Sequence, residues 1–390
     1  MAQTWIPSLR KRLMLGALDL FARMTRPRGD ARPPNASIQR ILVIELWNIG
    51  DVVLAMPFLA QLRVLFPKAK VTMLAQPHAR TILAGTGLVD DFVETELGWS
   101  ESAVRHNPLA YNWRELARVR RELKRRQLDV AFSSRMHVRE HVVLALSGAR
   151  RRVAFSLGDG HRVLTDAVPI GDPNRHKVDE WLELSRPFGG PVSVDSPRLN
   201  VSDAERRWAT AFLAVHGAST ETRIVGIHPG ASVPAKRWPM ERFAEVAATV
   251  ARTPDAKVLA FVAPDGHGEQ VGQVPEVIRA KVNLRELIAL VACCDVLVCN
   301  DSGPMHIAGA LDVPTVSVFG SGIQRWFSPL GDGHRVLTAE RGATESDTGA
   351  DSVTPFNVAS VSTSQVLDAV TEVLGAMKVY PNTRSPAPQI

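Results

Sequence analysis

Short apolar runs alternate with longer segments of helical periodicity along most of this chain. Runs of this length are typical of strands that are buried on both faces of a sheet. They lie at 41–44, 71–75, 129–132, 224–227, 258–262, 295–298 and 315–319. Apolar residues at helical spacing cover 52–65, 113–126, 203–216, 284–291 and 361–377. Strands that alternate with helices in this way predict βαβ units and parallel sheets.

The alternation stops at Phe188-Gly189-Gly190-Pro191 and then begins again. Two consecutive α/β halves of similar size predict two facing Rossmann-like domains with an interdomain cleft. We therefore expect four regions. They are a basic amphipathic leader and linker at 1–36, a first Rossmann-like domain at 37–190, a second at 191–345, and a loop, a helix and a disordered tail at 346–390.

The composition indicates a globular protein without a membrane span. The chain has 390 residues, 45% hydrophobic and 22% charged, which suits two ordinary domains. No apolar run approaches the roughly 20 residues of a membrane helix. Cys293, Cys294 and Cys299 lie in apolar sequence without the spacing of a zinc site, which predicts buried thiols and a cytoplasmic protein.

The net charge of +6 is concentrated near the start of the chain. Residues 1–36 carry seven basic residues against two acidic ones, so the remaining sequence is nearly neutral and nucleic-acid binding is disfavoured. Apolar residues between the basic clusters fall on one helical face. A segment of this kind, at 9–28, is typical of attachment to an anionic membrane surface. The alternative is a solvated leader, and a signal peptide fits poorly because Asp19 interrupts the apolar stretch.

The segment from Asn300 to His306 has the pattern of a phosphate-binding turn. It follows the apolar run 295–298 and leads directly into a helix rich in small residues. A strand that turns into a helix in this way leaves backbone N–H groups without partners, and these favour an anion. Ordinary capping by Asp301 and Ser302 is the alternative. Neither a GxGxxG nor a Walker sequence follows any predicted strand, which disfavours dehydrogenases and P-loop kinases.

Two further charged residues stand where predicted strands give way to loops. Asp51 follows Gly50 after the first strand, where it suits either a helix cap or a general base at the cleft edge of the sheet. Lys236 lies beside Arg237 in a loop rich in Gly and Pro. A cation there would stabilise a departing diphosphate, and the alternative is a solvated surface lysine.

Three segments in order resemble the ADP-heptose:lipopolysaccharide heptosyltransferases, which form glycosyltransferase family 9. They are ILVIELWNIGDVVLAMPFLAQLRVLFP at 41–67, VGIHPGASVPAKRWP at 225–239 and NDSGPMHIAGALDVPTVSVFG at 300–320. The resemblance spans about residues 40 to 330. It implies the GT-B fold, an inverting mechanism, and neither a metal ion nor a cofactor. The first domain would bind the acceptor, and the second would bind the nucleotide sugar.

The resemblance also implies roles for particular residues. Asp51 matches the general base and Lys236 the cation that receives the leaving diphosphate. The remaining matches for donor binding are Ser232, Glu269, Asp301, Ser302, Gly303, Pro304, Met305 and His306. Glu269 would contact the nucleoside ribose, with Asp265 as a rival, since the local sequence there departs from the family pattern. Trp238 is expected to pack the loop against its domain.

Acceptor contacts are expected from the first domain. The candidates are Asn48, Gly50, Arg135, His137 and Arg139. Cations such as these suit phosphorylated sugars, although a solvated basic surface explains them equally well. Trp47-Asn48 departs from the family pattern of small hydroxyl residues, which weakens the case for a standard inner-core acceptor.

The sequence therefore predicts a glycosyltransferase that transfers a heptose or related sugar from an ADP-sugar to a lipopolysaccharide-type or other saccharide acceptor. It would act in the cytoplasm, where the leader would attach it to the inner face of the cytoplasmic membrane. Two alternatives are a non-catalytic nucleotide-sugar-binding protein and a nucleotide-sugar epimerase. The epimerase would need further acid and base groups that the sequence does not identify.

Overall fold

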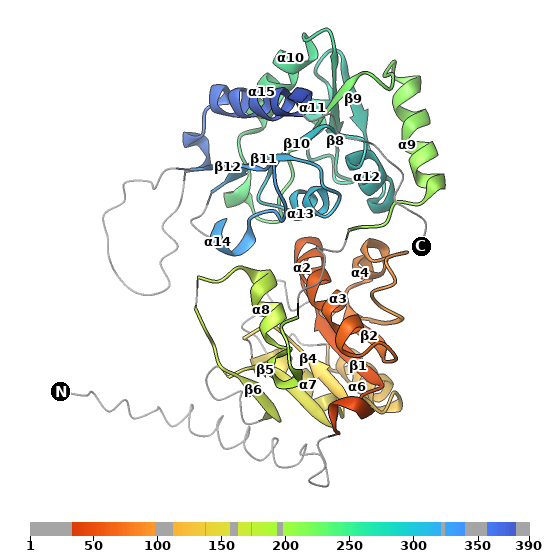
Figure 1. Cartoon of the computed structure of the whole chain (residues 1–390). Helices are drawn as coiled ribbons and strands as arrows, with labels where there is room; N and C mark the ends of the chain where they lie inside the picture. Colours follow the sequence, from red (N-terminus) through yellow and green to blue (C-terminus); the bar gives the residue numbers. More distant parts are fainter. Residues whose placement is uncertain are drawn as a thin grey trace, which may run out of the picture. The chain divides into compact units, whose positions relative to one another are not determined.

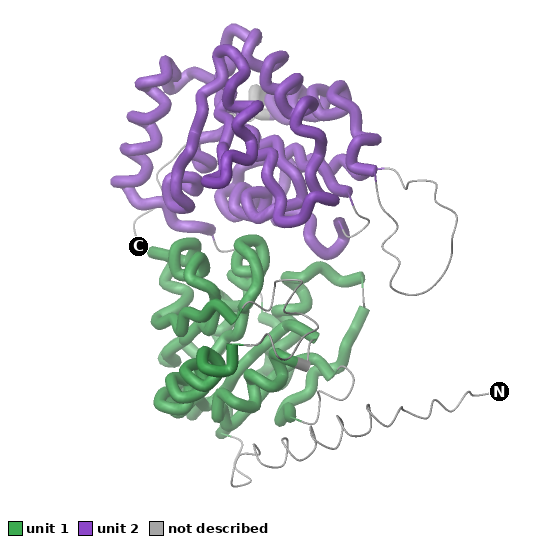
Figure 2. Tube along the Cα trace, turned by 180° about the vertical axis from the view of Figure 1, so that it is seen from behind, with its two compact units in different colours: residues 1–197 green, residues 198–390 purple. Residues whose placement is uncertain are grey.

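The computed structural model describes residues 33–97, 112–136, 138–156, 163–172, 174–192, 198–320, 324–339 and 357–379. The chain forms two compact units, Met1–Pro197 and Arg198–Ile390, which Figure 2 shows in different colours. The predicted leader therefore lies largely outside the described residues, as do the loop and the tail predicted within 346–390. Gln61 Nε2 donates to Val192 O over 3.0 Å, so the chain just beyond Gly190 still belongs to the first unit.

The first unit contains a parallel sheet in which β1 is central. The strand order is β3-β2-β1-β4-β5-β6. The bounds are β1 Arg40–Glu45, β2 Lys70–Ala75, β3 Asp91–Glu94, β4 Val130–Phe132, β5 Arg151–Phe155 and β6 Asp166–Val168. Ile41 pairs with Val71 on one side and with Val130 on the other. The predicted strands at 41–44, 71–75 and 129–132 are thus confirmed.

Helices on both faces cover this sheet (Figure 1). They are α2 Ile49–Leu54, α3 Met56–Leu65, α4 Pro77–Ile82, α6 Trp113–Arg125, α7 Val138–Leu146 and α8 Lys177–Glu183, with short 3₁₀ turns η1 Asn35–Ser37 and η4 Arg186–Phe188. Phe58 of α3 stacks on Trp181 of α8. Pro57 lies in the first turn of α3, where a residue without an N–H costs no helical hydrogen bond.

The second unit repeats the architecture. Its parallel strands run in the order β12-β11-β10-β7-β8-β9. The bounds are β7 Arg223–His228, β8 Ala256–Phe261, β9 Val277–Ala280, β10 Val296–Asn300, β11 Thr315–Phe319 and β12 Arg335–Thr338. When the strands of each unit are numbered from its first strand, the order is the same as in the first unit. In both sheets the order in which the strands are added reverses between the first and the fourth strand of the unit. Ligands of such sheets bind at this switch point, beside the carboxyl ends of the strands.

The helices of the second unit complete its layers. They are α9 Asp203–Val215, α10 Met240–Ala251, α11 Glu269–Gly272, α12 Leu284–Val291, α13 Gly303–Gly309, α14 Gln324–Phe327 and α15 Thr363–Val379, with 3₁₀ turns η5 Pro234–Lys236 and η6 Val358–Ser360. Within the part of the chain that the structure describes, no helix combines the length and apolar character needed to cross a bilayer.

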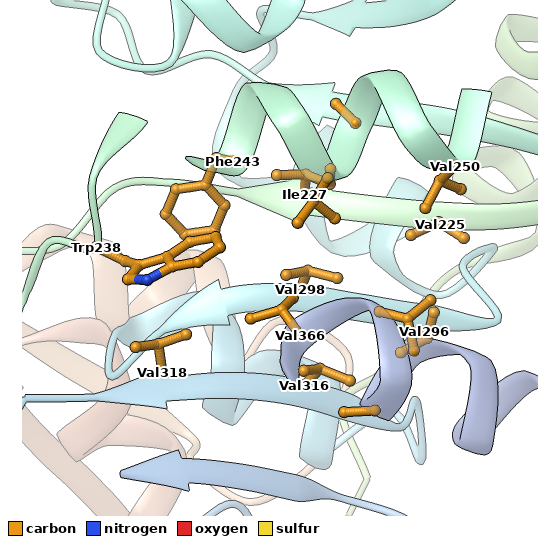
Figure 3. Packing of buried hydrophobic residues seen from close by; sticks show 14 of the residues in the cluster. Val225, Ile227, Trp238, Phe243, Val250, Val296, Val298, Val316, Val318 and Val366 are labelled. Carbon is orange, nitrogen blue, oxygen red and sulfur yellow. The ribbon is translucent and has the colours of Figure 1, made fainter. Parts of the chain in front are cut away.

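A buried cluster between α10, α15 and the sheet forms one core of the second unit. Alternate valines and isoleucines of β7, β10 and β11 point to this face, where Phe243 of α10 and Val366 of α15 cover them (Figure 3). Trp238 lies at the edge of the cluster and is only 1% exposed. The alternation places the other side chains of these strands on the opposite face of the sheet.

Several strands were not predicted from the sequence because they contain charged residues. They are β3, β5, β6, β9 and β12. Arg151 and Arg152 open β5, for example, and both are buried there. The Arg151 guanidinium binds Asp166 at 2.7 Å. A charged residue that finds its partner in the fold does not show the apolar pattern by which buried strands are recognised.

Candidate active-site residues in each unit

Asp51 lies where β1 gives way to α2, at the switch point of the first sheet. Its Oδ2 accepts the Asn48 N–H over 3.1 Å, so it does cap the helix as one reading of the sequence predicted. Its Oδ1 forms an ion pair with Nη2 of Arg135, which follows β4. The side chain is 15% exposed. Capping engages Oδ2 and the ion pair engages Oδ1, so both carboxylate oxygens of Asp51 have a partner.

Arg135 is half-buried and held by several groups, so the alternative of a solvated basic surface is wrong for this residue. Its guanidinium lies 4.8 Å above the Trp47 ring, and Nη2 is 4.0 Å from Glu45 Oε1. Burial alone would lower the pKa of Arg135, but the charges of Asp51, Glu45 and Glu140 raise it. Arg135 therefore stays cationic and ties Asp51 to the sheet.

Two buried carboxylates in this cluster were missed by the sequence analysis. Glu45 ends β1 and is 0% exposed, while Glu140 of α7 is 2% exposed. Trp47 donates its backbone N–H to Glu45 Oε1 over 3.0 Å and its Nε1–H to Glu140 Oε1 over 2.7 Å. Burial raises the pKa of both, to about 8 for Glu45. The signal for Glu45 was available, since a carboxylate directly follows a buried apolar run.

A pocket of about 150 Å³ opens beside Asp51 within the first unit. Its lining consists of Asp51, Leu54, Ser134, Arg135, Met136, Lys177, Glu180 and Trp181. Lys177 Nζ pairs with Glu180 at 2.7 Å, and neither residue was among the predicted acceptor contacts. The pocket thus combines a carboxylate that could accept a proton with cations that suit an anionic ligand.

The other predicted acceptor residues occupy different positions. Asn48 is exposed and begins α2, whereas Gly50 is buried inside it. Arg139 lies in α7, and His137 falls outside the described residues. Of the predicted acceptor set, the structure brings Arg135 and Asn48 into direct contact with Asp51.

In the second unit, the loops that follow β7 and β10 meet at the switch point. Asn300 joins them, since its Nδ2 donates to Pro229 O over 2.7 Å and its Oδ1 accepts the Trp238 N–H over 2.9 Å. The Trp238 indole donates to Val361 O over 2.9 Å, which confirms the prediction that Trp238 packs its loop. Burial lowers the pKa of His228 to about 4, so this ring at the end of β7 is neutral.

Lys236 and Asp301 form an ion pair with 2.6 Å between Nζ and Oδ2. The side chain of Asp301 is 5% exposed and that of Lys236 is 27% exposed, so the lysine reaches solvent. Asp301 thus fixes the position of the cation, and within the described chain no side-chain capping bond is present at the start of α13. The alternative of a freely solvated Lys236 is wrong.

Ser302 is the N-cap residue of α13 and follows Asp301 of this pair. Its hydroxyl is buried and has no hydrogen-bond partner among the residues described, and its backbone is extended where the helix starts. Gly303 is the first residue of α13, and Pro304 has no N–H. Ser232 is exposed in the loop after β7, and His306 lies buried in α13. The turn between Asp301 and Pro304 therefore offers polar groups beside a cation.

Three residues predicted to contact the donor are either buried or bound to a neighbouring side chain: Pro304, Met305 and Glu269. Met305 is 0% exposed and packs inside the unit, and Pro304 is also buried, so their side chains offer no surface to a ligand. Glu269 begins α11 and binds Arg279 at 2.8 Å. Its rival Asp265 accepts the His267 N–H over 3.0 Å, which closes the local turn. Hydrophobic packing and local ion pairs, which a motif cannot show, explain these placements.

Within the described parts of both units, no three His, Cys, Asp or Glu side chains converge as a metal site would require. The thiols of Cys293, Cys294 and Cys299 are reduced; Cys294 and Cys299 are buried as predicted, whereas Cys293 is only partly buried. Burial raises the pKa of Cys299, so its thiol stays protonated.

Comparison with known proteins identifies relatives with the same fold. The profile of a family described as glycosyltransferase family 9 (heptosyltransferase) matches residues 116–355. Lipopolysaccharide heptosyltransferase 2 of Salmonella typhimurium is 26% identical over 323 residues, which cover 76% of this chain and 87% of that protein.

Solved structures of similar fold come from the same family. The glycosyl transferase family 9 structure from Veillonella parvula superposes with a TM-score of 0.71 at 23% identity, over 89% of this chain and all of that one. The E. coli ADP-heptose lipopolysaccharide heptosyltransferase II gives 0.67 at 21% identity, over 87% of this chain and all of that one. These likenesses confirm the predicted GT-B fold of two parallel-sheet α/β domains.

Proposed function

Because the chain belongs to glycosyltransferase family 9, the heptosyltransferases, we propose that it transfers a heptose from ADP-heptose to a lipopolysaccharide-type acceptor with inversion at the anomeric carbon. The observation that carries this proposal is Asp51, a carboxylate at a sheet switch point that lines a pocket with basic residues. The names of the relatives support the sugar, the donor and the acceptor class.

In the proposed reaction, the acceptor hydroxyl enters the pocket and gives its proton to Asp51. The acceptor oxygen forms a bond to the anomeric carbon as the bond from that carbon to the diphosphate oxygen breaks. The electron pair of the broken bond leaves with ADP. Lys236, held by Asp301 at 2.6 Å, stabilises the charge that develops on the diphosphate. The lysine supplies the positive charge, so the proposal needs neither a metal ion nor a cofactor.

The diphosphate would lie at the turn that begins α13. The Ser302 hydroxyl, buried without a partner among the described residues, would donate to a phosphate oxygen, as would the N–H groups of Ser302 and Gly303. In the first unit, Arg135 and Lys177 line the pocket and would favour an anionic acceptor. Contact of residues 9–28 with the inner face of the cytoplasmic membrane remains part of this proposal.

One observation favours the alternative of a nucleotide-sugar-binding protein that transfers nothing. Both oxygens of Asp51 already have partners, the Asn48 N–H and the Arg135 guanidinium, so neither can take a proton without a rearrangement. Glycosyl transfer requires that one of these contacts be shared or loosened when the acceptor binds. The alternative predicts that the donor binds and no acceptor is modified.

The proposal is tested by incubating the protein with ADP-heptose and lipopolysaccharide from a heptose-deficient strain. We expect ADP release that depends on the acceptor, and a mass gain of one heptose residue in the lipid product. UDP- and GDP-sugars serve as control donors. Donor binding without any product, at all acceptor concentrations, would support the binding-protein alternative instead.

A further inference from the structure

One nitrogen atom of Arg135 serves two carboxylates from different elements. Nη2 forms the ion pair with Asp51 Oδ1 from α2 and lies 4.0 Å from Glu45 Oε1 at the end of β1. Both carboxylates are attracted to the same nitrogen, and when both are ionised they also repel each other. A change in the charge of Glu45 therefore changes the strength of the ion pair between Arg135 and Asp51.

The cluster has more acids than its cation can balance. Among the described residues, the negative charges of Asp51, Glu45 and Glu140 all raise the pKa of Arg135. Glu45 and Glu140 are almost inaccessible to water, so full ionisation of all three carboxylates would leave buried negative charge without compensation. The cluster is expected to retain a proton at neutral pH.

Glu45 is the best candidate to hold that proton. Glu140 has both oxygens satisfied, by Trp47 Nε1 and by the Ser133 hydroxyl. Glu45 accepts one bond, from the Trp47 N–H, and its Oε2 is buried with no partner among the described residues. Burial, with further contributions from Asp51 and Glu140, raises the pKa of Glu45 to about 8 despite the opposing effect of Arg135.

We propose that Glu45 is a positioning residue whose protonation state determines how strongly Arg135 holds Asp51, and hence how readily Asp51 accepts a proton. The inference rests on the proposed function, in which Asp51 is the base. When Glu45 is protonated, Arg135 binds Asp51 alone and keeps Oδ1 of Asp51 occupied. When Glu45 loses its proton to solvent, it competes for Nη2 and repels the Asp51 carboxylate, which frees Oδ1 of Asp51 to accept a proton.

The neighbouring ionisable groups do not reproduce this behaviour. Arg135 stays cationic, since its pKa is raised. His78 of α4, which also feels the charge of Asp51, has its pKa lowered by burial and is therefore neutral near pH 8. Glu140 of α7 bonds to Trp47 and Ser133 instead of Arg135. Glu45 is thus the group that faces Arg135 directly and changes charge in this range.

The first test does not depend on enzymatic activity. The side-chain carboxyl carbons of glutamate are labelled with ¹³C, and their NMR signals are followed against pH in the wild-type protein and in Asp51→Asn. Glu45→Gln assigns the signal, with Glu45→Asp as a second variant should Gln fail to fold. We expect Glu45 to titrate near pH 8 in the wild type and at clearly lower pH in Asp51→Asn, because coupling between two sites is mutual. An unchanged titration in Asp51→Asn overturns the proposal.

The second test uses the pH dependence of kcat/KM. We expect the wild-type value to rise about three- to tenfold as the pH passes through 8, and the Glu45→Gln value to stay at the lower level throughout. Glu45→Asp, which retains an ionisable group one methylene further away, should recover part of the rise. Asp166→Asn is the control, because it removes a buried ion pair with Arg151 in the same sheet and should leave the profile unchanged.

The two tests separate the possible failures. A wild-type protein without transfer activity refutes the proposed function, while the NMR titration still decides whether Glu45 and Asp51 are coupled. An active protein whose pH profile is the same in Glu45→Gln as in the wild type refutes the role of Glu45 alone.

Discussion

Replacement of Asp51 by asparagine is expected to lower kcat for heptose transfer about 10²–10⁴-fold, which is the usual contribution of a general base. Asparagine can still accept the Asn48 N–H, so the start of α2 should be preserved. It cannot take the proton of the acceptor hydroxyl. Initial rates of ADP release measure the loss, and calorimetric titration with ADP should give the same Kd as the wild-type protein.

A matched control separates catalysis from helix capping. Glu286 occupies the same position in α12 as Asp51 does in α2, and its carboxylate accepts the Asn283 N–H over 2.9 Å. Glu286→Gln should therefore change kcat by less than about twofold, because loss of a surface cap has only a local effect. If Asp51→Asn also kept its turnover, Asp51 would be a structural cap and the base would have to be sought elsewhere.

Replacement of Lys236 by methionine is expected to lower kcat about 10²–10³-fold, because the charge that develops on the departing diphosphate would lose the cation proposed to stabilise it. The apparent affinity for ADP should fall as well, since the product carries the same phosphates. Stopped-assay quantification of product and titration with ADP measure the two effects separately.

The partner of Lys236 provides the control for this variant. Lys236→Met leaves the Asp301 carboxylate buried without its 2.6 Å ion pair, which should cost about 1–3 kcal/mol of unfolding free energy. The double variant Lys236→Met/Asp301→Asn should recover most of this stability and none of the activity. Recovery of activity in the double variant would mean that Lys236 acts only through the fold.

The elements around both sites were predictable because their sequences are locally consistent. The central strands β1, β7 and β10 are apolar runs, and the Gly50-Asp51 and Asp301-Ser302-Gly303 turns follow them directly. A strand that is buried on both faces has few other sequences available to it. The packing role of Trp238 was also predictable, since a large apolar ring beside Pro239 suits a buried position.

The contacts that set the charges were not predictable from local sequence. Arg135 follows β4 and reaches Asp51 only because β4 lies next to β1 in the sheet. Glu140 enters the cluster from α7 through Trp47, the residue that departs from the family pattern. Partners that are distant in sequence meet through the strand order, which a periodicity analysis cannot supply. The same reason applies to β5, where Arg151 finds Asp166.

The anomeric configuration of the transferred sugar tests the central claim most directly. In the proposed reaction, Asp51 accepts a proton while the acceptor oxygen attacks from the side opposite the diphosphate. A single displacement of this kind inverts the anomeric carbon. The configuration is determined by NMR on product made from ADP-heptose of known configuration. We predict a product whose anomeric configuration is opposite to that of the donor, and retention of the donor configuration would contradict the account.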